Sequence, residues 1–260
     1  MTLAEITAET VENYILDRYE SAYGPKPATI YQEYSLARRI FNVSRKRWKL
    51  TSHNPFADVQ FSELLEINNE RDRSLSVEEE KILLEHATPA YLKQIIVFGI
   101  HTGCRRGEIL SINWRENIDM RQRLIRVIIS KRKPGEKSKV KVIPMSDTLY
   151  QMLLDMSKVP HMSGKLFPVT VSALKDAFER AVANAGIEDF HFHDLRHTFG
   201  TRLAEMGVPL TVIKELMGHR TIKTTERYIH HYPADLRPRM KALDDYYCHN
   251  LDTPDRMVIA

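Results

Sequence analysis

The stretch "HFHDLRHTFGTRLAEMGVPLTVIKELMGHRTIKTTERYIHH", residues 191–231, decides how the second half of the chain folds. Its apolar spacing, with glycines between the apolar runs, predicts three helices, at about 194–206, 209–217 and 222–231. His193 and Arg196 are three residues apart and therefore share one helical face. His219 and Tyr228 follow at the end of the stretch. Two hypotheses fit this pattern: a helix-turn-helix DNA reader, or side chains that meet around one reacting group.

The remainder of the second half is predicted to be helical around one hairpin. Helices are expected at about 76–87, 90–102, from about 103, at 146–157 and at 171–185. Between them, residues 123–145, "RLIRVIISKRKPGEKSKVKVIPM", carry β-branched residues on both sides of Pro134-Gly135, a pattern that predicts a β-hairpin. The expected fold class is mainly α with a small β-hairpin or sheet (α+β).

The first seventy residues predict a smaller helical domain. Two amphipathic helices cover about 5–24 and 26–50, and the second ends before Asn54-Pro55, because a residue before proline leaves the helical region. The segment that follows, residues 56–81, looks like a linker in which a helix restarts at Ser76, with the boundary near residues 60–73. We therefore expect a helical domain at 1–65 and a second domain at 73–260.

Composition narrows the class of protein. The chain has 260 residues, a net charge of +4 and 28% charged residues, an ordinary balance for a globular protein. Two cysteines do not make a disulfide framework. The acidic first ten residues do not form a signal peptide, and the longest apolar run, residues 95–100, is too short to span a bilayer. We expect a soluble, cytoplasmic protein with no membrane partner.

Two basic clusters indicate a polyanionic partner. Residues 121–141 hold nine basic residues and one acid, a charge density that favours contact with phosphates over a merely solvated hairpin. Arg45, Lys46 and Arg47 form a second cluster, in which Trp48 belongs either to the core or against sugar and base.

Other candidate residues lie in two further short motifs. In "TGCRRGEIL", Arg105 and Glu108 share a helical face, so the carboxylate either orients the guanidinium or forms an ordinary surface ion pair. In "HFHDLRH", no cysteine or acid cluster completes a metal-ligand set around the histidines, so no metal is expected. His197 is expected to be a hydrogen-bonded core residue.

Taken in order, "TGCRRGE", the basic hairpin, "HDLRH" and "LMGHRTIKTTERY" resemble the motifs of the tyrosine recombinases, or phage integrases, over about residues 73–232. The first seventy residues are similar to the family's helical core-binding domain, so the resemblance implies that domain followed by a catalytic one. Many integrases also carry an arm-binding domain ahead of this region, which is not among these 260 residues. The implied activity is cleavage and rejoining of DNA strands through a 3′-phosphotyrosine, without metal, ATP or other cofactor.

The resemblance also implies a role for each matching residue. Tyr228 would be the nucleophile, Arg105 and Arg196 would clamp the scissile phosphate, and Glu108 would orient Arg105. His219 would donate a hydrogen bond to the phosphate and His193 would assist removal of the tyrosine proton. Lys131 would be the general acid, with Lys133 as its rival because the hairpin register is open. The basic residues expected to contact DNA are Arg45, Lys46, Arg47, Arg132 and Lys133.

The implied partners are double-stranded DNA, further copies of the chain in a synaptic tetramer, and an accessory DNA-bending or directionality protein. The segment from Pro233 onward resembles the family's C-terminal element, which packs either on a neighbouring copy or on its own subunit. A type IB topoisomerase and a non-catalytic helix-turn-helix regulator are the alternatives, and only a covalent protein–DNA adduct separates the regulator from the enzymes.

Overall fold

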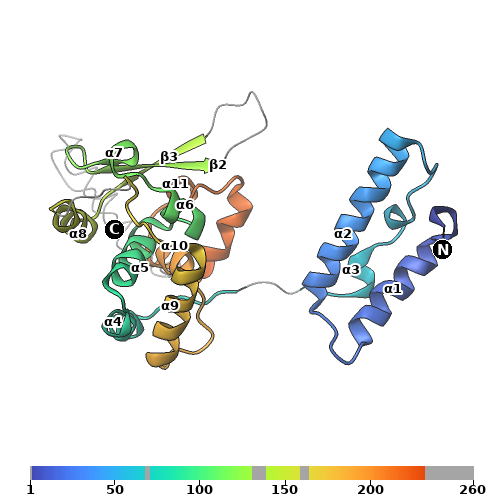
Figure 1. Cartoon of the computed structure of the whole chain (residues 1–260), viewed down its shortest axis with the longest axis horizontal. Coiled ribbons are helices and arrows are strands. Elements are labelled where there is room, and N and C mark those ends of the chain that lie inside the picture. The colour runs from blue at the N-terminus through green and yellow to red at the C-terminus, as the bar shows by residue number, and fades with distance from the viewer. Residues whose placement is uncertain (1, 68–70, 131–138, 159–163, 232–260) are drawn as a thin grey trace, which may run out of the picture. The chain divides into compact units, whose positions relative to one another are not determined.

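The structure, a computed structural model, describes residues 2–67, 71–130, 139–158 and 164–231. The chain divides into two compact units, residues 1–71 and 72–260, each with its own hydrophobic core (Figure 1). The described part is mainly helical with one small sheet, which confirms the predicted fold class. Within it, no helix is both long and apolar enough to cross a membrane.

The first unit is built on two long helices. Helix α1 (Ala8–Glu20) begins after Thr7, whose hydroxyl accepts a hydrogen bond from the Thr10 amide. Helix α2 (Pro27–Val43) begins with proline and continues as a π-helical turn, Ser44–Trp48. Apolar side chains spaced three or four apart on both helices form the core between them.

The stretch expected to be a linker is instead part of this core. It contains the 3₁₀ helix Pro55–Ala57 and the short helix α3 (Phe61–Leu64). Phe56, Val59 and Phe61 are buried against α1 and α2, and the Tyr34 hydroxyl donates to the Phe56 and Val59 carbonyls at 2.8 and 2.7 Å. The linker prediction was therefore wrong for residues 56–65.

In the second unit, α5 (Ala90–Thr102) forms the centre of the core. Its side chains at Leu92, Ile95, Ile96 and Phe98 are fully buried, and α10 (Asp194–Glu205) lies beside it. An added Cβ at Gly99 would lie 3.3 Å from the Leu195 side chain, so glycine leaves room for α10 at this position. The remaining helices are α4 (Val77–His86), α6 (Arg106–Ser111), α7 (Trp114–Asn117), α8 (Asp147–Ser157), α9 (Val171–Asn184) and α11 (Leu210–Met217).

The sheet contains the predicted hairpin and one further strand. Strands β2 (Leu124–Ser130) and β3 (Lys139–Pro144) pair antiparallel, and the two-residue strand β1 (Ile118–Asp119) joins the other edge of β2. On β3, Lys141 and Ile143 face the core while their neighbours are exposed, and Lys141 lies opposite the buried Val127. The Pro134-Gly135 turn lies outside the described residues.

The last predicted helix is not an α-helix. Residues 222–231 form two 3₁₀ segments, Ile222–Thr224 and Glu226–His231. The Tyr228 amide donates to the Thr225 carbonyl, three residues back, and the Thr225 hydroxyl bonds to His219. A bond that spans three residues is the pattern of a 3₁₀ helix, which winds more tightly than an α-helix.

Candidate active site

Arg196 connects three of the motifs found in the sequence. It lies on α10 with 3% of its surface exposed. One guanidinium nitrogen donates to the Gly103 carbonyl and the other to the Met217 carbonyl, each at 2.6 Å. Gly103 ends α5 two residues before Arg105, and Met217 ends α11 two residues before His219. Arg196 therefore brings these two turns, and the residues that follow them, to one place.

Both turns depend on glycine. Gly103 and Gly218 have φ angles of +58° and +68°, in the left-handed region, which other residues adopt only with strain. Each follows the last residue of its helix and ends that helix one or two residues before a candidate catalytic residue.

Arg105 precedes α6 and is held by Glu108. The Glu108 carboxylate accepts from the Arg105 guanidinium at 2.9 Å and from the Arg105 backbone amide at 3.1 Å. Glu108 is 7% exposed, while the side chain of Arg105 is about half exposed, so the pair is not an ordinary surface ion pair. The arrangement leaves the guanidinium fixed at its base and accessible to a ligand.

The sequence reasoning missed a second partner of Glu108. The Lys141 ammonium lies 3.1 Å from a Glu108 oxygen, and its side chain is 2% exposed. Lys141 had been counted among the phosphate-facing residues of the hairpin, which is wrong for this residue because it points into the core. Burial by itself raises the pKa of Glu108, but the nearby Lys141 charge and the bonds from Arg105 bring it below its ordinary value.

The histidines on either side of Arg196 are held neutral. His219 is buried and its Nδ1 bonds to the Thr225 hydroxyl at 2.8 Å. Burial, followed by the charges of Arg196 and Arg105, lowers the pKa of His219 to about 3. The same causes lower the pKa of His193, which begins α10. A neutral imidazole can accept a proton or donate its single N–H.

Tyr228 is packed inside the unit. It is 1% exposed, and its hydroxyl lies 3.4 Å from Nδ1 of His197, a length at which the hydrogen bond is weak. Its ring lies against the backbone of Gly200, where an added Cβ would come within 2.4 Å of a ring carbon. Burial raises the pKa of Tyr228 to about 12, although the charges of Arg196 and Arg227 oppose this shift.

Two residues next to the Tyr228 hydroxyl or chain position are His197 and Arg227. His197 is buried, as a core histidine should be, and its ring also lies 5.3 Å from that of His193. Burial, with the charge of Arg227, lowers the pKa of His197 to about 4. Arg227, which sequence reasoning overlooked, lies 3.4 Å from the other ring nitrogen of His197. Its position directly before Tyr228 is the only sequence signal that could have found it.

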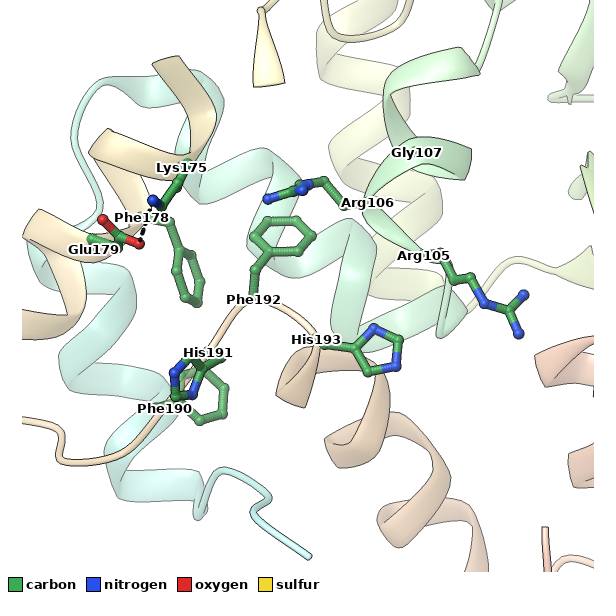
Figure 2. Close-up of a pocket in the computed structure, with 10 residues that line it drawn as sticks. All are labelled: Arg105, Arg106, Gly107, Lys175, Phe178, Glu179, Phe190, His191, Phe192 and His193. Atoms are coloured by element: carbon green, nitrogen blue, oxygen red, sulfur yellow. Dashed lines mark ion pairs between the residues drawn. The ribbon is translucent and has the colours of Figure 1, made fainter. Parts of the chain in front are cut away.

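A pocket of about 500 Å³ opens beside the site (Figure 2). Figure 2 shows the Arg105 guanidinium directed away from the phenylalanines of the pocket, with His193 between them. The pocket is lined by aromatic and basic side chains together, including Phe178, Phe192 and Arg106. It extends the surface that carries Arg105 and His193 toward α9.

The other predicted residues are placed as follows. Lys131, Arg132 and Lys133 lie outside the described residues, as does the segment from Pro233 onward. Lys46 and Arg47 are exposed in the first unit, with Trp48 exposed beside them and therefore not in the core; Arg45 is half-buried. In the described ranges, no three histidine, cysteine or acidic side chains are grouped so that they could hold a metal ion.

The order and geometry of these motifs agree with a match to a known family. The profile of the phage integrase family covers residues 73–235, more than half of the chain. The chain belongs to this family.

Relatives in the family are similar over most of this chain. The integrase of Salmonella phage P22 is 28% identical over 243 residues, which are 86% of this chain and 60% of that protein. The shufflon-specific DNA recombinase of Escherichia coli is 30% identical over 205 residues, 78% of this chain and 50% of that protein. The chain thus spans half to three fifths of the length of these relatives.

Solved structures of integrases share the fold. The integrase of transposon Tn1549, in complex with a circular intermediate DNA, superposes with a TM-score of 0.71 at 22% identity, over 94% of this chain and 86% of that one. A lambda integrase dimer bound to a core site gives a TM-score of 0.64 at 17% identity, over 85% and 81%. The catalytic domain of the bacteriophage HP1 integrase is 27% identical, with a TM-score of 0.52, over 68% and 96%.

Proposed function

We propose that this chain is a site-specific DNA recombinase, an integrase that cleaves and rejoins DNA strands through a 3′-phosphotyrosine. One observation carries the proposal: Arg196 is bonded to the two turns that precede Arg105 and His219. Two guanidiniums and two neutral imidazoles are thereby gathered in the unit that also holds Tyr228. Double-stranded DNA is the proposed substrate, which agrees with the DNA bound in the solved structures of family members.

In the proposed reaction, the Tyr228 oxygen attacks the scissile phosphorus. The bond from phosphorus to the 5′-oxygen breaks, and a phosphotyrosine and a free 5′-hydroxyl result. Arg105 and Arg196 offer planar, forked donors to the phosphate oxygens, and two of the five N–H donors of Arg196 are used on backbone carbonyls. Removing one donor to charge that develops in a transition state typically costs about 10²–10³ in rate.

Proton transfer completes the proposed step. His193, neutral and exposed, is the proposed acceptor of the tyrosine proton, and His219 the donor to a non-bridging oxygen. Lys131, or Lys133 in its place, is proposed to protonate the departing 5′-oxygen. In the reverse direction, the 5′-hydroxyl of a second strand attacks the phosphotyrosine. Because every phosphodiester broken is replaced by another phosphoester bond, the exchange needs no ATP. Arg105, Arg196 and His219 are proposed to supply the charge stabilisation that metal ions give in other phosphoryl-transfer enzymes.

The proposed DNA-binding surface includes the first unit, as a core-binding domain. Lys46, Arg47 and Trp48 are exposed together on the turn after α2, which suits contact with phosphates and sugars, and Arg45 flanks them. Residues 1–65 are thus proposed to bind DNA and residues 73–260 to cut it, with Arg132 and Lys133 as further contacts.

Further copies of this chain in a synaptic tetramer, and an accessory bending or directionality protein, are proposed as partners. The cytoplasm, where such DNA would be met, is the proposed compartment. The regulator and topoisomerase alternatives are not favoured, since the relatives are integrases and recombinases.

The test uses a library of nicked duplex oligonucleotides with randomised sequence. Wild-type protein is expected to form adducts that survive detergent, whose DNA is then sequenced to find the preferred site. Tyr228→Phe should form no adduct and still bind the selected duplex within a few-fold of wild type. An adduct formed by that variant would show that another residue is the nucleophile. If wild-type protein binds the duplex but forms no adduct, the non-catalytic helix-turn-helix regulator becomes the better explanation.

A further inference from the structure

Lys141 is a buried cation that the proposed reaction does not yet use. It lies on β3 with its side chain 2% exposed and its ammonium 3.1 Å from Glu108. A lysine in such a position pays a large desolvation cost and is retained only with a charged partner. Its burial also prevents contact with DNA, so any influence on the reaction has to pass through another residue.

Glu108 is the residue through which that influence passes. One of its oxygens accepts from the Arg105 guanidinium at 2.9 Å, and the other accepts from the Arg105 amide at 3.1 Å and meets the Lys141 ammonium. Glu108 therefore holds both the side chain and the backbone of Arg105. Both oxygens accept strongly only when the carboxyl is ionised, since protonation turns one of them into an O–H donor and weakens it as an acceptor.

The lysine is also placed against the other side of the site. An added Cβ at Gly218 would lie 3.3 Å from a carbon of the Lys141 stem, so the stem supports the turn that precedes His219. Cys104, directly before Arg105, is buried near the same ammonium. Lys141 thus lies between the turn before Arg105 and the turn before His219.

We propose that Lys141 is a positioning residue for DNA cleavage: it keeps Glu108 ionised, and Glu108 in turn fixes the guanidinium of Arg105 where the scissile phosphate binds. The inference rests on the proposed function, because it assigns Arg105 to that phosphate. Placing a reacting group about 1 Å away from its productive position can cost on the order of 10² in rate.

The experiment measures the rate of adduct formation at saturating duplex, selected from the library above, between pH 6 and 9. Lys141→Met keeps the stem and removes the charge, so the pKa of Glu108 should rise, because Arg105 alone then opposes the effect of burial. The variant is expected to be roughly 10–100-fold slower than wild type at pH 7. Its rate should recover as the pH rises and Glu108 ionises, whereas the wild-type rate should show no such rise. Lys141→Arg should retain more activity than Lys141→Met.

Three controls separate positioning from other roles. In Lys141→Met/Glu108→Gln the recovery at high pH should disappear, and the double variant should be no slower than Glu108→Gln alone. That double variant has neither buried charge, so it should fold at least as well as either single variant. Lys158→Met removes a lysine from an exposed pair with Asp155 and should leave the rate unchanged.

A duplex with sulfur at the bridging 5′ position distinguishes a proton donor from a positioning residue, because a thiolate leaves without protonation. It should not restore Lys141→Met. Restoration by sulfur would make Lys141 the general acid and overturn the proposal. Two other results for Lys141→Met would also overturn the proposal. One is a rate of adduct formation that is lowered equally at every pH, in proportion to a loss of folded protein. The other is a rate within twofold of wild type. If wild type itself forms no adduct, the proposed function fails as a whole.

Discussion

Gly200→Ala tests how the Tyr228 side chain packs against α10. Gly200 lies in the middle of α10, and a Cβ there would lie 2.4 Å from one ring carbon of Tyr228 and 2.7 Å from its oxygen. Carbon atoms in contact normally lie about 3.5–4.0 Å apart, so the ring would have to move by about 1 Å. The three nearest atoms to the added methyl all belong to Tyr228. The clash is thus with this one side chain.

Gly200→Ala is expected to change the free energy of unfolding in opposite directions when position 228 is tyrosine and when it is alanine. With tyrosine at 228, overpacking costs about 1–3 kcal/mol, and alanine in place of glycine inside a helix returns roughly 0.5–1 kcal/mol. The net effect should be a destabilisation of about 1 kcal/mol. With Tyr228→Ala the ring is gone, and Gly200→Ala should stabilise by roughly 0.5–1 kcal/mol. The coupling between the two positions is then about 2 kcal/mol.

The assay is urea unfolding followed by tryptophan fluorescence. Trp48 is in the first unit and Trp114 in the second, so Trp48→Phe leaves a reporter for the relevant unit alone. Gly107→Ala is the matched control: it lies in α6 with no atom within 4 Å of an added Cβ, and it should not couple to position 228. Stabilisation by Gly200→Ala in both backgrounds would refute the packing of Tyr228 on this helix.

Three further predictions follow from the site. Arg196→Lys should slow adduct formation by at least about 10²-fold and lower the melting temperature, because the compact ammonium of lysine lacks the planar fork with which a guanidinium spans two carbonyls and a phosphate; normal strand exchange would contradict this. Adduct formation should persist in EDTA, and its loss there would require a metal in the chemical step. Below pH about 6.5, His197 and His219 bind protons in the unfolded chain but stay neutral in the folded one, because their folded pKa values are lowered to about 4 and about 3. The free energy of unfolding should therefore fall as the pH is lowered toward 4, by at most about 1.4 kcal/mol per pH unit for each histidine. A melting temperature that is independent of pH over this range would refute the burial of these rings.

The helices and the ordered motifs could be predicted because each depends on neighbouring residues. His193 and Arg196 share a helical face whatever the rest of the chain does, and Gly103 and Gly218 each mark the end of a helix. Residues 56–65 could not be assigned in this way. Their buried apolar side chains do not repeat at one period, so neither the helical nor the strand pattern detects them.

The partner of Glu108 was equally hard to predict. Alternation along β3 places Lys141 in phase with the buried Ile143, which is a signal for burial. Val140 and Val142, however, make the opposite face look just as apolar, although both are exposed. The face that points inward is decided by the packing of the sheet on the helices, which no local pattern contains.

The two carbonyl bonds of Arg196 have a consequence for how such a protein can change over evolution. A side chain that ties three separate segments together is needed by the fold as well as by the reaction, so losing it should damage both. The Tyr228 hydroxyl contacts α10 through one weak hydrogen bond, to His197. A related protein that binds DNA but has lost the proposed cleavage activity would therefore be expected to have substituted Tyr228 first and to have kept Arg196.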